Sequence, residues 1–126
     1  MASSNYSVRL FSSFSRDLEP IWRRFESECD HYVFQCYDFL FHWQNAVGNA
    51  SRRVRPCILA VTEKADPVAL FPFGIRRILG ARVLEFLGGE QTDYNSLLIH
   101  PKYADPQTCR KIWEAIVPCL PAHDNR

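Results

Sequence analysis

Three strand-like segments with very short links between them constrain the fold of this chain most. Pro56–Glu63 contains the almost continuous apolar run CILAV, which is typical of a buried central strand. Val68–Arg76 and Ala81–Leu87 follow it after the turn-like residues KAD and ILG. Because such short links cannot cross over a sheet, we expect an antiparallel meander. Pro72 inside the second segment indicates an edge position or a bulge, since proline has no amide hydrogen for a ladder.

Apolar residues recur at helical spacing in three other segments. The first segment runs from about Asp17 to Cys29, and the second runs from about Gln35 to Val47, where Gly48 is expected to end it. The third runs from about Pro106 to Val117, with Asp105 as its amino-terminal cap. The predicted buried stripes are Leu18, Ile21, Trp22, Phe25 and Cys29, then Cys36, Phe39, Leu40, Trp43 and Val47, then Cys109, Ile112, Trp113, Ile116 and Val117.

Two more strands complete the pattern. We expect Tyr6–Phe11 to be the first strand, although the serine- and arginine-containing start of the chain also allows a transit peptide. Asn95–His100 is expected to add a strand after the meander. The resulting order predicts an α+β fold, in which helices pack on a mostly antiparallel sheet. We expect a single domain over residues 1–126, with residues 1–5 and 119–126 poorly ordered.

The composition is that of a globular protein and excludes several functions. Apolar residues make up 47% of the 126 residues and charged residues only 23%. A formal net charge of +1 provides no field that would attract nucleic acid or an anionic membrane. No apolar run is long enough to cross a bilayer. We therefore expect neither a nucleic-acid partner nor a membrane span.

The cysteines and histidines form no metal-binding or disulfide motif. The number of cysteines is odd, and no C-x-x-C pair occurs. We interpret them as reduced thiols of a cytoplasmic protein, with a disulfide or metal framework as the alternative. The histidines form no pair at i, i+4, so we predict no metal site. The cysteines are Cys29, Cys36, Cys57, Cys109 and Cys119.

The second helical segment has more apolar surface than one small sheet needs. Besides its main stripe, it carries Tyr37 and Phe41 on a different side. One interpretation is an aromatic-rich helix that is buried within the chain. The other is a helix that also packs on a partner, including a second copy of this chain bound through Tyr37 and Phe41.

The segments and their order resemble a known family. The order resembles the front part of the acyl-CoA-dependent N-acetyltransferase fold, GNAT, and more closely the bacterial CelD-like acetyltransferases. The resemblance covers nearly all of this chain but only the N-terminal half of such a protein. It implies transfer of an acyl group to an amine or hydroxyl, with acyl-CoA bound by a second acetyltransferase-like half. The segments that carry it are FQCYDFLFHWQNAVG, PCILAVTEKADPVALFPFGIRR, LGARVLEFLGGEQTDYNSLLIHP and the closing amphipathic helix.

The start of the last helix lacks the cofactor loop of such enzymes. An active family member has [RQ]-x-x-G-x-[GA] there, whose free amides hold the pyrophosphate of the cofactor. The equivalent stretch, Tyr103–Cys109, has no glycine, while Pro106 has no amide hydrogen and Asp105 adds a carboxylate. We therefore expect this chain alone to bind no cofactor, and acyl-CoA to bind only the complete family member. A second near-match, Arg77–Arg82, precedes a strand and is interpreted as a hairpin turn.

The polar insertion GGEQTDYN is the candidate substrate site. The resemblance implies that Asp93 and Tyr94 line the cleft between the two halves and hold the acyl acceptor. A carboxylate there can orient an amine or act as its base. The alternative is a plain loop in which Asp93 caps a turn. No catalytic residue is identified, and the predicted substrate-binding residues are Glu90, Gln91, Asp93 and Tyr94.

A short basic run precedes the first strand of the meander. Arg52, Arg53 and Arg55 are interpreted as a solvated loop, because nothing in the sequence positions them against phosphates of CoA. The leading hypothesis is thus the N-terminal half of a CelD-like acyltransferase that is inactive alone. The alternative is a non-catalytic interaction module that pairs with another chain or with itself.

Overall fold

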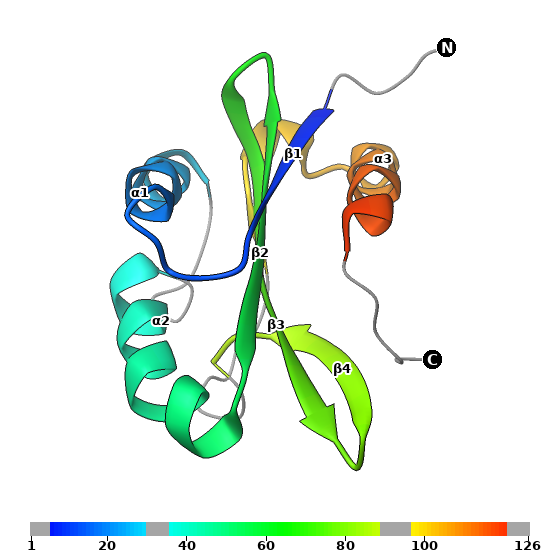
Figure 1. Ribbon diagram of the computed structural model, residues 1–126. Coiled ribbons are helices and arrows are strands. Elements are labelled where there is room, and N and C mark those ends of the chain that lie inside the picture. The colour runs from blue at the N-terminus through cyan, green and yellow to red at the C-terminus, as the bar shows by residue number, and fades with distance from the viewer. Residues whose placement is uncertain (1–5, 30–35, 89–96, 121–126) are drawn as a thin grey trace.

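The computed structural model describes residues 6–29, 36–88 and 97–120 and consists of one sheet with helices on both faces (Figure 1). Every described ladder of this sheet is antiparallel, which confirms the α+β class and the mostly antiparallel sheet. The strands lie in the order β1 (Tyr6–Phe11), β2 (Arg55–Glu63), β3 (Asp66–Ile78) and β4 (Ala81–Phe86), while the short β5 (Leu98–Ile99) also pairs with β3.

Two tight turns build the predicted meander. Lys64 and Ala65 connect β2 to β3 with φ angles of 51° and 70°. Leu79 and Gly80 connect β3 to β4 with φ angles of 52° and 87°. Two-residue turns of this left-handed kind match the twist of the flanking strands. The segment Arg77–Arg82 is therefore a hairpin turn, as its sequence predicts.

Strands β4 and β5 share one edge of β3, and this edge is interrupted at Pro72. The amide of Leu87 donates to the carbonyl of Pro72 at 2.8 Å, whereas Leu98 pairs with Leu70. Along this edge of β3, the pairing partner therefore changes from the end of β4 to β5 across Phe71 alone. The carbonyl of Pro72 points toward the β4 side of β3, and in a strand the amide position of the same residue points the same way. The missing amide hydrogen of Pro72 therefore removes no hydrogen bond between β3 and β2. The register shift between β2 and β3 lies elsewhere, at Val61–Thr62.

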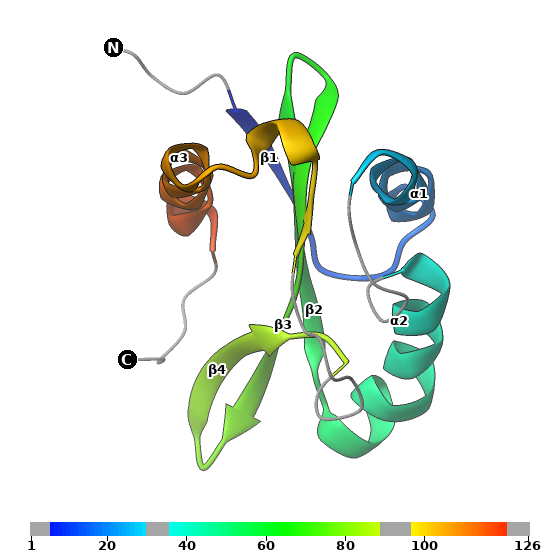
Figure 2. The same ribbon diagram turned by 180° about the vertical axis from the view of Figure 1, so that it is seen from behind.

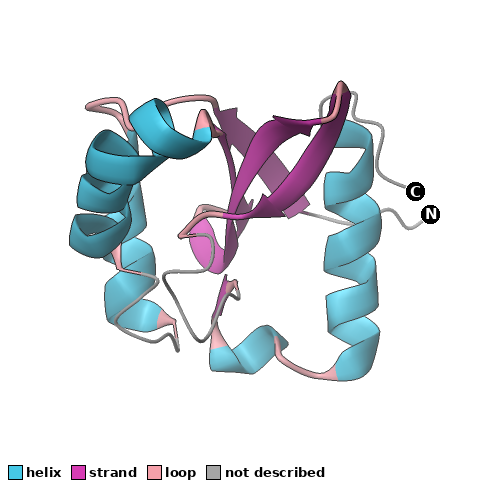
Figure 3. Cartoon of the chain, turned by 90° about the horizontal axis from the view of Figure 1, so that it is seen from below, coloured by secondary structure: helices cyan, strands magenta, loops and turns pink. Residues whose placement is uncertain are grey.

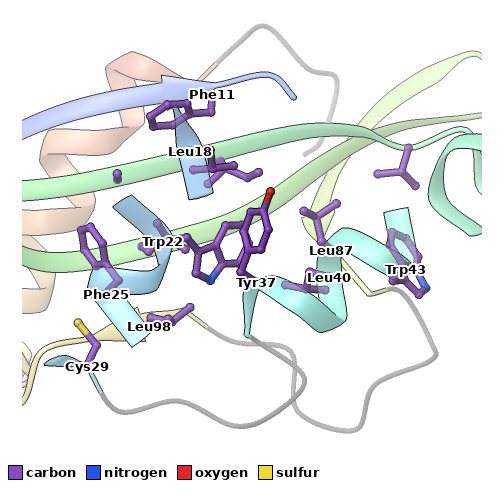
Figure 4. Packing of buried hydrophobic residues seen from close by; sticks show 14 residues of the cluster. Phe11, Leu18, Trp22, Phe25, Cys29, Tyr37, Leu40, Trp43, Leu87 and Leu98 are labelled. Atoms are coloured by element: carbon purple, nitrogen blue, oxygen red, sulfur yellow. The ribbon is translucent and has the colours of Figure 1, made fainter. Parts of the chain in front are cut away.

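Helices α1 (Leu18–Glu28) and α2 (Tyr37–Trp43) cover one face of the sheet (Figures 1 and 2). The predicted stripe of α1 is confirmed, since Leu18, Trp22 and Phe25 are all buried. Figure 4 shows Trp22 beside Tyr37 in this core, together with Leu18 of α1, Leu40 of α2 and the leucines Leu87 and Leu98. The two aromatic rings meet edge to face at 5.7 Å between centroids.

The aromatic side chains of α2 have partners within the chain. Tyr37 is only 5% exposed, and its ring also meets that of Phe14 at 5.7 Å between centroids. Phe41 is half-buried and stacks on Tyr37. The interpretation of a buried aromatic helix is therefore correct for Tyr37. Phe14 and Trp22 cover the ring of Tyr37, so little of it remains for a second copy, and association through Tyr37 and Phe41 stays a prediction.

The second helix runs past Gly48, contrary to the sequence-based prediction. It continues from α2 as a π-helix, η2 (Gln44–Arg52), and Arg53 follows with a left-handed φ of 55°. A Cβ atom at Gly48 would lie 2.7 Å from Oε1 of Gln44 and 2.8 Å from Cζ3 of Trp43. Gly48 is thus required by close packing inside a helix and not by a left-handed helix end.

Helix α3 (Pro106–Ile116) lies on the opposite face of the sheet, as Figure 3 shows from another direction. Ile112 and Ile116 are buried there, as predicted. The rest of the predicted stripe is wrong: Cys109 is exposed, Trp113 is 48% exposed and Val117 is 45% exposed. Only a narrow band of α3 meets the sheet, so residues one turn apart on its flank remain at the surface.

Two 3₁₀ turns flank α3, namely η4 (Pro101–Tyr103) and η5 (Val117–Cys119). Residues 1–5 and 121–126, which were expected to be poorly ordered, lie outside the described residues, but Cys119 and Leu120 lie within them. Asn95 and Ser96 of the predicted strand also lie outside, and β5 is its described part. In the described ranges, no helix combines the length and hydrophobicity that a bilayer crossing requires.

Candidate functional site

The residues predicted to bind substrate lie between the end of β4 and β5 in the sequence. The two points where their segment joins the sheet are placed, at Leu87 and Leu98. Both side chains are buried in the core beneath α1 and α2. Gly88 follows Leu87 with a φ of 99°, a conformation that favours glycine. Glu90, Gln91, Asp93 and Tyr94 themselves lie outside the described residues.

The carboxylate of Asp105 caps the amino-terminal end of α3, as predicted. Oδ2 of Asp105 accepts a 3.0 Å hydrogen bond from the amide of Thr108, and Pro106 occupies the first helical position. Hydrogen bonding from Thr108, first from its side chain and then from its amide, holds the pKa of Asp105 below its ordinary value. An anionic ligand placed at this helix end would meet a carboxylate. The arrangement is that of a structural junction.

A cavity of about 460 Å³ opens on another side of the molecule. It lies between the link from β1 to α1, the π-helix η2 and the beginning of β2. Of the basic run in the sequence, Arg53 and Arg55 line this cavity, while the side chain of Arg52 lies outside the described part. Sequence reasoning missed the cavity because its walls come from three separate segments. The lining residues are Ser12, Ser13, Phe14, Phe41, Gln44, Asn45, Asn49, Arg53, Val54, Arg55 and Pro56.

Gln44 is the buried polar residue of this cavity wall, with 3% of its surface exposed. Its Nε2 donates to Oδ1 of Asn49 at 2.6 Å and to the carbonyl of Val54 at 2.7 Å. These bonds tie η2 to the residue just before β2. Oε1 of Gln44 has no hydrogen-bond partner among the described residues. A buried acceptor without a hydrogen bond lowers the stability of a fold by about 1–3 kcal/mol, so this oxygen of Gln44 is destabilising at this place.

A second polar cluster lies where β2 ends. The hydroxyl of Tyr103 donates to Oε1 of Glu63 at 2.6 Å, and the ring of Tyr6 lies 6.4 Å away between centroids. The hydrogen bond to Glu63, together with burial, raises the pKa of Tyr103 to about 12. Burial likewise raises the pKa of Tyr6. Both phenols therefore stay protonated at neutral pH, and the cluster acts as a hydrogen-bonded anchor for η4.

The cysteine side chains differ in burial. Cys36, Cys57, Cys109 and Cys119 carry free thiols. Burial raises the pKa of the Cys57 thiol to about 11, which opposes its ionisation. Cys109 is exposed, and its sulfur lies 3.7 Å from the carbonyl oxygen of Tyr103. Over the described ranges, no three His, Cys, Asp or Glu side chains gather in a way that would hold a metal ion.

Comparisons with family models, with curated proteins and with solved structures each give no match to this chain.

Proposed function

We propose that this chain is the N-terminal half of a GNAT-type, CelD-like acyltransferase, and that it contributes to the acyl-acceptor cleft. The observation that carries the proposal is the order of elements. A strand, two helices, a three-stranded antiparallel meander, a further strand and a helix follow one another in the order that the family resemblance implies. Helices on both faces of the sheet agree with it.

The start of α3 supports the assignment of cofactor binding to a second half. Asp105 caps the helix, and Pro106 removes an amide hydrogen that a pyrophosphate would need. Acyl-CoA would therefore bind the missing half, and this chain alone would be inactive. Bound to that half, acyl-CoA supplies the reactive thioester.

The acceptor side is assigned to the segment that follows Leu87 and precedes Leu98 in the sequence. Its flanks, Leu87 and Leu98, are buried, so the segment between them is attached at both ends to the rigid sheet. In this proposal Asp93 accepts the proton of the acceptor amine. The new bond joins the amine nitrogen to the acyl carbon, the carbon–sulfur bond breaks, and CoA leaves as a thiolate that takes up the proton held by Asp93.

A reconstitution experiment tests the proposal. The chain is mixed with the separately purified C-terminal half of a CelD-like acyltransferase, together with acetyl-CoA and a panel of amines. Free CoA is then measured by chromatography, which avoids thiol reagents that would also label Cys109. We expect the mixture to release more CoA than the two components separately, and Asp93→Asn to reduce this release. The control Asp17→Asn removes an exposed carboxylate that makes no capping bond to α1 and should leave the release unchanged.

Thermal unfolding of this chain alone tests the cofactor assignment. A ligand at 100 times its dissociation constant stabilises a protein by about 2.7 kcal/mol, which shifts the melting temperature by several degrees. We expect acetyl-CoA to cause no such shift. A saturable shift would contradict the assignment of acyl-CoA to the other half, and failure of the reconstitution would contradict the acyltransferase proposal.

One observation favours the alternative function, a non-catalytic interaction module. Trp113 of α3 and Val117, the first residue of η5, are exposed four positions apart. Self-association in this alternative would use α3 and not Tyr37. Sedimentation at increasing concentration tests it: a dimer that Trp113→Gln dissociates would support the module, and a monomer throughout would oppose self-association.

A further inference from the structure

We infer that the cavity lined by Gln44, Arg53 and Arg55 binds a small organic anion. This binding site is independent of the proposed acyltransferase function. Its volume of about 460 Å³ is that of a typical small-molecule pocket. It is also distant in sequence from the start of α3 and from the insertion that follows β4.

The charge of the lining favours an anion. Arg53 and Arg55 both line the cavity and are exposed to solvent. No aspartate or glutamate belongs to the lining. Neither arginine forms an ion pair with another described residue. Guanidinium groups form paired, charge-assisted hydrogen bonds with the oxygens of a carboxylate or a phosphate.

The remaining walls indicate that the anion is organic. Apolar surface comes from Phe14 and Phe41, whose rings lie 5.9 Å apart between centroids, and from Val54 and Pro56. A small ring or hydrocarbon group can pack on this surface. Ser12, Ser13, Asn45 and Asn49 also line the cavity, and their polar groups can form hydrogen bonds with the remainder of the ligand.

The cavity is held in shape before any ligand arrives. The two hydrogen bonds from Nε2 of Gln44 fix η2 against the start of β2. Val54 adds a third link, since its amide donates to the carbonyl of Gly48 at 2.7 Å. Arg53 adopts a left-handed backbone conformation. For any residue except glycine, this conformation is unfavourable in free energy. The fold thus accepts both a strained arginine and an unsatisfied Gln44 oxygen at one place.

The common chemistry of the ligand is an oxyanion attached to a small apolar group. Phenyl phosphate and benzoate are suitable probes, because they share the ring and differ only in the anion. Benzylamine is the matched control, since it has the same ring with a positive charge. Each compound is titrated into the full chain at constant ionic strength while amide chemical shifts are followed by two-dimensional NMR. We expect one or both anions to give saturable shifts at residues 44–49 and 53–56, and benzylamine to give none.

Two variants test the role of the arginines. Arg53→Asn removes one guanidinium group and introduces asparagine, which tolerates the left-handed backbone conformation at this position. Arg55→Gln removes the other guanidinium group from an exposed position at the beginning of β2. Each should weaken binding of the anion about tenfold, which is the effect of losing one charge-assisted hydrogen bond. Arg110→Gln is the control, because it removes the same charge from an exposed position of α3 on the opposite face. It should leave binding unchanged.

The outcomes are distinct from those of the acyltransferase test. Stronger binding of phenyl phosphate than of benzoate would identify a phosphate ester as the ligand class, and the reverse order would identify a carboxylate. Absence of saturable shifts with both anions would overturn the inference. Equal weakening by Arg110→Gln would also overturn it, because binding would then depend on net charge alone. None of these results depends on acetyl-CoA or on the second half.

Discussion

The phenol of Tyr103 donates a 2.6 Å hydrogen bond to Oε1 of Glu63, which lies 40 positions earlier in the chain. Glu63 is the last residue of β2, and Tyr103 closes η4 just before α3. The ring of Tyr103 is 8% exposed and packs in the core under α3. This pair therefore fixes where α3 begins relative to the sheet.

Removing the hydroxyl of Tyr103 should destabilise the fold. We expect Tyr103→Phe to lower the free energy of unfolding by about 1 kcal/mol, which is the usual net contribution of one hydrogen bond. Denaturant unfolding measures this change. A double-mutant cycle with Glu63→Gln isolates the pair, and additive effects of the two substitutions would show that the pair contributes no coupling energy.

The same pair should make stability depend on alkaline pH. The pKa of Tyr103 is raised from 10.0 to about 12, so the folded chain keeps this proton at pH values where the unfolded chain has lost it. The contribution of Tyr103 is complete below about pH 10 and is lost as the pH rises toward 12. We expect the difference in stability between the native chain and Tyr103→Phe to shrink over this range. A constant difference would contradict the prediction.

Asp105 should contribute to stability at neutral pH and lose this contribution in acid. Its pKa lies below the ordinary 3.8 because the folded state favours the carboxylate that caps α3. Protonation as the pH falls through the folded pKa removes the favourable cap. We expect Asp105→Ala to lower the melting temperature by several degrees at neutral pH and by less in acid. Asp17→Ala is the control, since Asp17 makes no side-chain cap to α1.

Gly48→Ala should be destabilising although alanine favours helices. The added Cβ would meet Oε1 of Gln44 at 2.7 Å, which forces the buried amide or the helix to move. We expect a loss of about 1–3 kcal/mol, as for other overpacked sites. Combining it with Gln44→Ala should recover part of the loss due to Gly48→Ala. If Gly48 were instead a left-handed helix end, the second substitution would not relieve that loss.

Two cysteines should differ in their reaction with alkylating reagents. Cys109 is exposed, whereas Cys57 is 2% exposed and its pKa is raised to about 11 by burial. We expect iodoacetamide to label Cys109 rapidly in the folded chain and Cys57 only on unfolding. Mass spectrometry of peptides gives both rates. Rapid labelling of Cys57 under native conditions would show that the central strand opens locally.

The sheet could be predicted closely because its signals are local. The apolar run in β2 and the short turns around Lys64 and Gly80 leave an antiparallel meander as the simplest arrangement. The cap at Asp105 was also predictable, because a capping bond joins residues only three apart. The bounds of β1 and α1 likewise follow from patterns within a few residues.

Much less of the candidate site could be predicted from the sequence. Arg53 and Arg55 were recognised only as a basic run, since other lining residues, such as Ser12 and Phe14, lie about forty positions earlier in the chain. The substrate residues predicted around Asp93 lie outside the described residues, so their role stays a prediction. A cavity is formed by segments that meet only after folding, and no spacing in the chain encodes it.

The sequence by itself determined the strands, the turns and the capped helix, because each depends on contacts between near neighbours. Only the tertiary structure decided how apolar surface is shared. It buries Tyr37 under Phe14 and leaves Trp113 at the surface, although both belong to amphipathic helices. It also carries the helix through Gly48 as a π-helix, because Gln44 packs across that glycine and bonds to Val54. Burial depends on which elements meet, and periodicity describes one element at a time.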